Sequence, residues 1–221
     1  IRQLIPEIHR VVKESEIMLL RNRIFLDRMQ GVGILTKEQA LSYGVTGPVA
    51  RSTGIPYDVR KDHPYLVYDR FDFDVPVGED GDNWDRFMVR LEEIRQSIRI
   101  IEQALEQMPD DGPINVDDPR IVFPEKQDVY TTIEATIAHF KLVMEGLQVP
   151  KGEVYSFTEG GNGELGFHIV SDGSGTPYRV RVRPPCWYNL AASREMLLGG
   201  MIADIIPTFG SVNMIGGECD R

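Results

Sequence analysis

GMIADIIPTFGSVNMIGGECDR is the closing stretch of the chain, from Gly200 to Arg221. Its apolar run, Met201 to Ile206, has the spacing of a helix and carries a single acid, and we expect it to stop at Pro207. The remainder is punctuated by glycines, keeps apolar residues such as Met214 and Ile215, and ends on charged residues, whereas chain ends are usually polar and frayed. This mixture of core-type residues, permissive glycines and opposite charges predicts a tail that threads into a cavity. The rest of the chain must then build the walls of that cavity.

The composition limits the classes of partner. The chain has 221 residues, of which 42% are hydrophobic, so it can bury a sizeable core. Its net charge of −10 and isoelectric point near 4.9 argue against nucleic acid and against anionic lipid, since both select basic faces. No stretch approaches the roughly 20 uninterrupted apolar residues that a membrane-spanning helix needs. The sequence therefore predicts a protein that is soluble by itself or peripheral to a membrane.

Cysteine and histidine spacing indicates no metal site. The two cysteines, Cys186 and Cys219, form no C-x-x-C pair, and each is expected to be a buried free thiol. The four histidines lack the H-x-x-x-H and H-E-x-x-H spacings of metal-binding helices. The chain also opens inside a helical pattern without an initiator Met. We therefore expect it to be the C-terminal part of a longer protein.

The first 80 residues mix helical and irregular patterns. Apolar residues recur at helical spacing over residues 3–28, which predicts one amphipathic helix. A capping box, Thr36–Gln39, opens a short helix that ends near Tyr43. Residues 44–64 are rich in Gly and Pro and are expected to be irregular, whereas Phe71–Val75 alternates like a short strand.

Two long helices are predicted next. The first is capped by Asp82 or Asn83 and carries apolar residues at steps of four and three as far as Met108. The second covers about residues 126–147 with the same spacing. Such stripes usually pack in a core or a bundle, and the loop between the helices favours an antiparallel pair.

After Pro150 the period changes from helical to alternating. Three strands are predicted at Val154–Thr158, Leu165–Val170 and Tyr178–Arg183, with glycine-rich turns between them, as in a β-meander. The stretch Gly161–Gly166 spells the dinucleotide fingerprint G-x-G-x-x-G, but an alternating run follows it where that fingerprint requires a helix. The sequence therefore predicts a hairpin here and no nicotinamide site.

These patterns together indicate an α+β fold, mainly α, in which a helical bundle core carries a small antiparallel β-meander. We expect one domain in three parts. Residues 1–150 form the helical core with an irregular segment at 44–80, residues 151–186 the meander, and residues 187–221 a helix and a tail that returns to the core.

Several runs spread over the whole length resemble the D subunit of NADH-quinone oxidoreductase, respiratory complex I. The resemblance rests on Gly47-Pro48 with Arg51, Tyr57–Lys61, Phe73–Gly78, Arg90–Arg99, His139–Lys141, Val170–Ser174 and Gly217–Arg221. It covers only the C-terminal half of that family. The family is related to the large subunit of nickel-iron hydrogenases, which implies a mostly helical fold with a small sheet. Those relatives bind nickel and iron through a C-x-x-C in the tail, whereas Cys219 stands alone here.

The resemblance implies that the vacated metal pocket serves quinone, as substrate. The subunit would belong to the peripheral arm on the cytoplasmic side of the cell inner membrane. Its partners would be the iron-sulfur subunit of the quinone module, which carries the terminal cluster, the adjoining peripheral-arm subunit and the membrane subunit at the quinone entrance. The complex would pass electrons from NADH to ubiquinone or a related quinone and translocate protons. No catalytic residue and no metal ligand is assigned to this chain.

The resemblance also implies site residues in the tail. Met214 and Ile215 would line the quinone chamber near the headgroup, and Asp220 would be buried close by. Ordinary core packing is the alternative for the two apolar residues. An ion pair with Arg51 or Arg60 is the alternative for Asp220, because a buried carboxylate needs a partner.

Two departures from the family pattern fall at Asn162, where a base is usual, and Asn213, where an acid is usual. One positive and one negative charge are lost together, so we predict that these two residues face each other along the quinone channel. Arg51, Asp58 and Arg60 are expected to form a buried ionic scaffold around the tail.

Three other functions stay open. An equivalent subunit could take electrons from coenzyme F420 or ferredoxin, since the donor site lies elsewhere in such a complex. A hydrogenase-type large subunit is disfavoured by the missing C-x-x-C. A purely structural module of the arm is the third possibility.

Overall fold

The computed structural model describes residues 1–109 and 111–220. Arg221, which closes both the tail and the resemblance motif, lies outside the described residues. The chain divides into two compact units. Unit 1 contains Ile1–Gln107, Phe157–Gly166 and Arg183–Arg221, and unit 2 contains Met108–Ser156 and Phe167–Val182. The units therefore interleave along the sequence, and all three strands of the sheet are divided between them.

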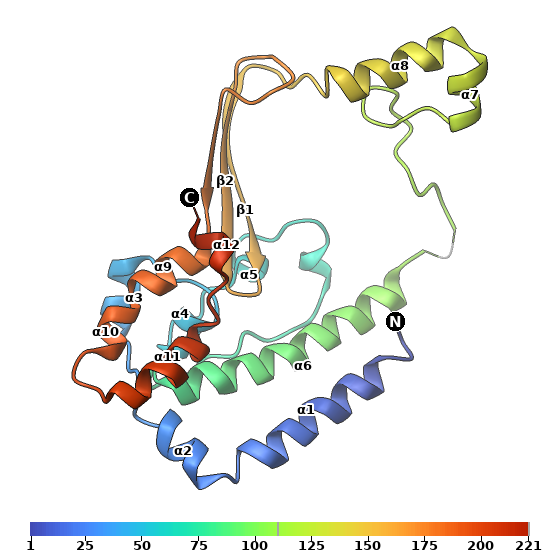
Figure 1. Cartoon of the computed structure of the whole chain (residues 1–221). Helices are drawn as coiled ribbons and strands as arrows, with labels where there is room; N and C mark the ends of the chain where they lie inside the picture. The colour runs from blue at the N-terminus through green and yellow to red at the C-terminus, as the bar shows by residue number, and fades with distance from the viewer. Residues whose placement is uncertain (110, 221) are drawn as a thin grey trace. The chain divides into compact units, whose positions relative to one another are not determined.

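Two helices open unit 1, so the prediction of one helix over residues 3–28 is wrong. Helix α1 spans Ile5–Leu19 and α2 spans Arg23–Met29. The break occurs at Asn22, whose backbone is extended and whose side chain accepts hydrogen bonds from the backbone N–H groups of Ile24 and Phe25. A side chain that caps a new helix competes with continuation of the old one. Figure 1 shows α1 running beside α6. An ion pair between Glu16 of α1 and Arg95 of α6 links the two helices.

The next segment confirms one prediction and corrects another. Helix α3 (Lys37–Tyr43) is preceded by the predicted capping box, with Thr36 and Gln39 bonding reciprocally. The segment 44–64, expected to be irregular, contains two short helices, α4 (Pro48–Ser52) and α5 (Val59–Asp62). Proline at the first position of α4 and the Asp58 cap of α5 supply the local signals for helix starts. A 3₁₀ turn, η1 (Tyr68–Arg70), follows.

The alternating stretch Phe71–Val75 is not a strand, contrary to the prediction. Side chains of helix α6 (Asn83–Gln107) satisfy its backbone instead. Gln103 Oε1 accepts from the N–H of Asp72 at 2.8 Å, and Gln96 Oε1 accepts from the N–H of Asp74 at 3.0 Å. Phe73, between them, is buried. Because the N–H groups of Asp72 and Asp74 already have glutamine acceptors, they do not need the carbonyl acceptors that a neighbouring strand would supply.

Helix α6 is the longest element and confirms the prediction. Asp82 caps it by accepting from the N–H of Asp85 at 2.8 Å. The predicted apolar stripe is only partly core, because Leu91 and Ile98 are buried while Ile94 and Ile101 are each 39% exposed. A second face of the helix, with Arg86 and Val89 buried, packs instead against α4 and the C-terminal helix α11.

Unit 2 carries two helices where one was expected over residues 126–147. Helix α7 spans Lys126–Thr131 and α8 spans Ile133–Met144. Thr132 is extended between them, and its hydroxyl accepts from the N–H of Ala135, which caps α8. Neither helix has a buried residue. Helix α6 belongs to unit 1, so the predicted antiparallel pairing with it stays a prediction.

The sheet confirms the predicted meander. Its strands are β1 (Gly152–Gly160), β2 (Gly163–Ser171) and β3 (Arg179–Arg183), in the order β1-β2-β3. Neighbouring antiparallel strands are joined by the two glycine-rich turns that the sequence indicated. The G-x-G-x-x-G stretch is thus part of a hairpin, as predicted, and opens no helix.

Five elements complete the described part of the chain: α9 (Pro185–Ala191), α10 (Ser193–Leu197), η2 (Ile202–Asp204), α11 (Ile205–Val212) and α12 (Gly216–Cys219). Pro207 lies in the first turn of α11, so the prediction that it ends a helix is wrong. The N–H groups of a first turn have no intrahelical acceptor, and proline is therefore tolerated there. Asp204, just before α11, forms an ion pair with Arg28 at 3.0 Å.

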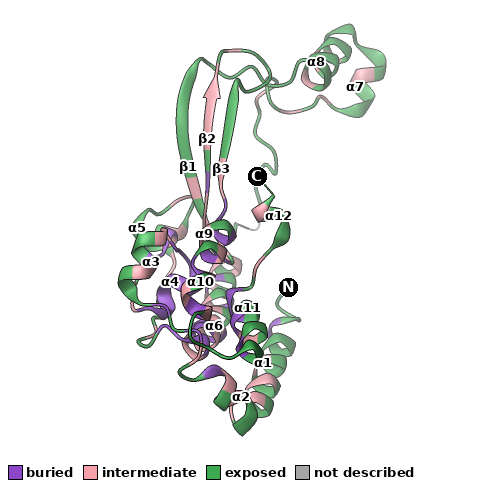
Figure 2. Cartoon of the chain, turned by 60° about the vertical axis from the view of Figure 1, so that its left-hand side comes forward, coloured by how far each residue is buried: buried purple, intermediate pink, exposed green. Residues whose placement is uncertain are grey.

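The hydrophobic core of unit 1 lies between the short helices. It comprises Leu35, Ala40, Val45, Val49, Ala50, Ala192, Met196 and Val212. Figure 2 shows the buried residues gathered around α4, α6 and α9–α11, whereas α7 and α8 are largely exposed. The predicted fold class, α+β and mainly α with a small antiparallel sheet, is confirmed. Among the described helices, none has both the length and the apolar character that crossing a bilayer requires.

Candidate functional site

The candidate site is built on the turn between β1 and β2. Gly47, with φ of +71°, approaches this turn so closely that a Cβ would lie 2.5 Å from the carbonyl oxygen of Asn162. Gly163, with φ of +132°, would place a Cβ 2.5 Å from the hydroxyl of Thr46. Only glycine fits either position. The contact presses the turn against the start of α4 and leaves Asn162 only 4% exposed.

Asn162 and Asn213 are in direct contact, which confirms that they face each other, while their place along a quinone channel stays a prediction. The side-chain Nδ2 of Asn213 donates to Oδ1 of Asn162 at 2.9 Å. We call these two residues the amide clasp. Asn213 ends α11 in the left-handed conformation, with φ of +55° and ψ of +52°. Asparagine is among the few residues other than glycine that adopt this conformation readily, so the backbone gives a second reason for its presence here.

A buried thiol lies in contact with the clasp. Asn162 Nδ2 donates to Cys186 Sγ at 3.3 Å, and the backbone N–H of Ile215 donates to the same sulfur at 3.4 Å. The N–H of Cys186 itself donates to the carboxylate of Glu218 at 2.9 Å. Burial, reinforced by Glu218, raises the pKa of the Cys186 thiol to about 11. Cys186 is therefore a protonated thiol at neutral pH, and its sulfur accepts from Asn162 of the turn and from Ile215 of the tail.

A third amide supports the clasp from α9. Asn189 is fully buried, and its Nδ2 donates to the backbone carbonyl of Asn162 at 3.1 Å. Its Oδ1 is a buried acceptor without a hydrogen-bond partner among the described residues. Three asparagines and one thiol thus fix the junction of the hairpin turn, α9 and the tail.

The tail beyond the clasp lies on the surface of unit 1, so the prediction that it threads into a cavity is wrong. Ile215 is 49% exposed, Met214 is partly buried, and α12 contains no buried residue. Asp220, predicted to be buried, is exposed. The physical reason is that the carboxylate directed inward is that of Glu218, which accepts from Cys186 two residues before Asp220. Cys219 is only partly buried, unlike Cys186.

Arg51, Asp58 and Arg60 form the expected ionic cluster. Arg51 is 1% exposed and pairs with Glu93 at 2.6 Å and Glu159 at 2.9 Å. Arg60 binds Asp58 with two hydrogen bonds, of 2.9 and 2.6 Å, and Asp58 lies 3.7 Å from Arg51. The cluster joins α4, α5, α6 and the end of β1. The expectation that it surrounds the tail stays a prediction.

Burial and pairing act in opposite directions on the acids of this cluster. Burial raises the pKa of Glu159, and the nearby Arg51 guanidinium only partly offsets that effect. Burial also disfavours ionised Asp58, but its interactions with Arg60 and Arg51 outweigh burial and lower the pKa below its usual value. Of these two acids, Glu159 is therefore the more easily protonated.

The residues around the clasp do not fit a nickel-iron centre. Such a centre needs several thiolates, whereas Cys186 is a neutral thiol bonded to amides and Cys219 lies on the four-residue helix α12. Among residues 1–109 and 111–220, no group of three or more His, Cys, Asp or Glu side chains could hold a metal ion.

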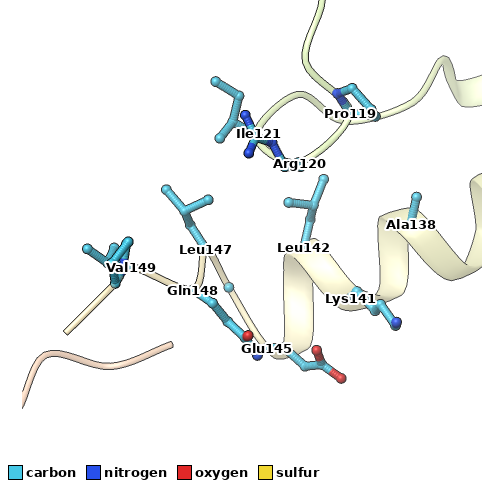
Figure 3. Close-up of a pocket in the computed structure, with 12 residues that line it drawn as sticks. Pro119, Arg120, Ile121, Ala138, Lys141, Leu142, Glu145, Leu147, Gln148 and Val149 are labelled. Atoms are coloured by element: carbon cyan, nitrogen blue, oxygen red, sulfur yellow. The ribbon is translucent and has the colours of Figure 1, made fainter. Parts of the chain in front are cut away.

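A separate cavity of about 710 Å³ lies in unit 2. Figure 3 shows Leu142 of α8 and Leu147 after it rising toward the loop that carries Arg120 and Ile121. Ala138 and Val149 extend the apolar lining. No residue that the sequence analysis assigned to a site lines this cavity.

Comparison with known proteins identifies the family. All of residues 1–221 match the family described as respiratory-chain NADH dehydrogenase, 49 Kd subunit. The chain belongs to this family. It is 67% identical over 211 residues to a D subunit of NADH-quinone oxidoreductase from Sorangium cellulosum, a match that covers 96% of this chain and 52% of that protein. The family resemblance drawn from the sequence is thereby confirmed.

Other relatives agree. The D subunit of the NADH-quinone oxidoreductase of Myxococcus xanthus is 56% identical over 224 residues, covering 98% of this chain and 54% of that protein. The corresponding protein of Leptospira biflexa is 49% identical over 207 residues, covering 94% and 51%. The chain spans about half the length of the curated relatives it matches.

Sequence reasoning missed several residues of the site. Cys186 and Glu218 were seen only as a free thiol and a tail charge, because no spacing rule links residues so far apart in the chain. Also missed was the second buried face of α6, where Arg86 and Val89 are buried and Arg90 and Glu93 follow at helical spacing. The spacing of these residues could have indicated a second buried face, but the buried face of α6 was predicted from the apolar residues alone.

Proposed function

We propose that this chain is part of the peripheral-arm D subunit of a proton-translocating NADH-quinone oxidoreductase and forms one wall of its quinone-binding chamber. Membership of the 49 kDa subunit family supports the complex, and the relatives named above are all subunits of NADH-quinone oxidoreductases. The chain would not be active alone. Electrons would come from an iron-sulfur cluster in a neighbouring subunit, while this chain shapes the site in which quinone is reduced.

The observation that best supports the chamber is the 2.9 Å hydrogen bond of the amide clasp. Asn162 and Asn213 fix the point at which the chain leaves α11, and the next two residues, Met214 and Ile215, follow directly. Their apolar side chains would contact the quinone ring. Because both clasp residues are neutral, the wall would present hydrogen-bonding groups to the quinone without an uncompensated charge.

The exposed face of the tail would contact the rest of the complex. Asp220 is exposed in this chain and would lie at a subunit boundary near the chamber. The proposed neighbours are the iron-sulfur subunit of the quinone module, the adjoining peripheral-arm subunit and the membrane subunit at the quinone entrance. The proposed location is peripheral, on the cytoplasmic side of the cell inner membrane.

The test replaces one apolar tail residue in the assembled complex. Ile215→Ala is expected to raise the KM for a short-chain quinone about tenfold, because it removes apolar contact with the ring. Ile202→Ala is the matched control: Ile202 is 87% exposed, precedes α11 and should leave the KM unchanged. Electron transfer from NADH to ferricyanide, which does not need quinone, should be normal in both variants.

Three results would favour the other functions. Unchanged quinone kinetics and inhibitor sensitivity in Ile215→Ala would contradict the chamber and favour a structural module of the arm. Failure of the complex to assemble with Ile215→Ala would also favour a structural module of the arm. A complex that reduces quinone from F420H2 or ferredoxin, and not from NADH, would place the chain in an equivalent subunit of another quinone oxidoreductase.

A further inference from the structure

A cavity of about 460 Å³ lies within unit 1 where α2, α6 and α11 meet. We call it the Arg90 pocket. These three helices converge in Figure 1. Its walls include Phe25 and Met29 of α2, Phe87 and Arg90 of α6, and Pro207 of α11. The aromatic rings of Phe25 and Phe87 pack edge to face at 5.2 Å and make one side of the pocket apolar.

Arg90 has hydrogen-bonding capacity that the described chain does not use. Its NH1 donates to the backbone carbonyl of Arg86 at 3.1 Å and its NH2 to the carbonyl of Val212 at 3.2 Å. Its Nε is buried and has no hydrogen-bond partner among the described residues. A buried donor without an acceptor is unfavourable and uncommon in folded proteins.

Two arginines line the pocket: Arg28 pairs with Asp204, whereas no ion pair of the described residues balances Arg90 or its helical neighbour Arg86, which lies outside the lining. Arg86, one helical turn before Arg90, is fully buried and donates to four neutral acceptors, on Gly33, Gly81, Asn83 and Ser211. Neither arginine takes part in an ion pair with a carboxylate of the described chain. Burial lowers the pKa of each arginine to about 10, and the charge of Arg90 adds to the effect on Arg86. An acceptor with a negative charge is therefore the natural complement of this pocket.

We propose that the Arg90 pocket binds an amphipathic molecule with an anionic oxygen headgroup on an apolar body. A medium-chain fatty carboxylate is the simplest member of this class. The carboxylate pairs with the guanidinium of Arg90, which lines the pocket, and the alkyl chain lies against Phe25, Met29 and Phe87. Asn213 lines both this pocket and the proposed quinone wall, but the proposal goes beyond the quinone role because it rests on the charge of Arg90 and on the apolar side chains of α2 and α6.

The test uses a photoreactive decanoate, carrying a diazirine on its alkyl chain, with the intact complex that contains this protein. Labelled peptides should map to α2 and α11, and excess decanoate should displace the label. Decanol, which has the same chain without the charge, and a decyl-substituted quinone should displace it at least tenfold less well. Equal displacement by decanol or by the quinone would overturn the assignment of an anionic ligand, and absence of label from both helices would overturn the site.

Two variants test the same site in different ways. Arg90→Gln should reduce labelling at least tenfold, since the charge is lost. Gly210→Leu fills the pocket: Gly210 lines it, and a Cβ there would meet nothing within 4 Å. Leucine is also a better helix former than glycine, so α11 should fold at least as well. The matched control is Gly152→Leu, at an equally open position in unit 2. Labelling that persists in Gly210→Leu would refute the pocket even if Arg90→Gln failed to fold.

Discussion

Exchanging the amide clasp for an ion pair tests the geometry of the site most directly. The variants are Asn162→Lys, Asn213→Asp and the double variant, which places a base and an acid at the two positions where the family pattern has them. Aspartate tolerates the left-handed backbone of residue 213 nearly as well as asparagine. This double-mutant cycle therefore changes the charge and the hydrogen bonding of the clasp, while residue 213 can keep its left-handed backbone conformation.

The structure sets the expected magnitudes. Asn162 is 4% exposed, so a lysine there without a carboxylate partner should cost about 3–5 kcal/mol of folding free energy. Asn213 is exposed, and an aspartate loses its hydrogen bond to Asn162 Oδ1 but stays hydrated, which should cost about 1–2 kcal/mol. In the double variant the two charges lie in hydrogen-bond range. We expect a coupling free energy of about 2 kcal/mol, within the range for residues in contact.

The assay can follow unit 1 alone. The two tryptophans, Trp84 and Trp187, both belong to unit 1, and Trp187 is adjacent to Cys186. Thermal unfolding followed by tryptophan fluorescence should show the double variant melting about 4–8 °C above the sum of the two single effects. A control cycle combines Asn213→Asp with Gln107→Lys, the same charge at the exposed end of α6, and should be additive. Coupling below about 0.5 kcal/mol in the clasp cycle would refute the reasoning.

Three further outcomes follow from local geometry. Thr36→Ala removes the capping box of α3 and should lower the free energy of unfolding by about 1 kcal/mol, measured by urea titration; a shift near zero would contradict the cap. Gly47→Ala should destabilise by more than about 2 kcal/mol, because its Cβ would lie 2.5 Å from the carbonyl of Asn162, and wild-type stability would show that the contact is absent. Below pH 9, iodoacetamide should label Cys219 well before the buried Cys186, and equal labelling of the two thiols would contradict that burial. The folded-state pKa of Cys186, about 11, is raised above the usual value of 9.0. The stability that this thiol contributes is therefore present below pH 9 and lost as the pH rises toward 11.

Elements that depend on nearby residues could be predicted from the sequence. The capping box of α3, the long helix α6 and the three-stranded meander all follow from patterns within one element or one turn. The helix breaks at Asn22 and Thr132 were missed although they are local too. There the apolar spacing continues across the break, and the capping side chain decides against a continuous helix.

The contact of Asn162 with Asn213 was also predicted, but by a different argument. A base and an acid are absent together, and charge balance in a site of low dielectric constant favours their paired loss. The sequence by itself determined the capping box of α3, the long helix α6 and the meander, and comparison with the family pattern pointed to the two clasp positions. Only the tertiary structure decided which face of α6 is buried, that Asp220 is exposed, that Glu218 turns inward to Cys186, and that Arg90 Nε lacks an acceptor in the described part of the chain. Those outcomes depend on how α2, α9 and α11 pack around α6, and burial and pairing between segments far apart in sequence leave no periodic signal along the chain.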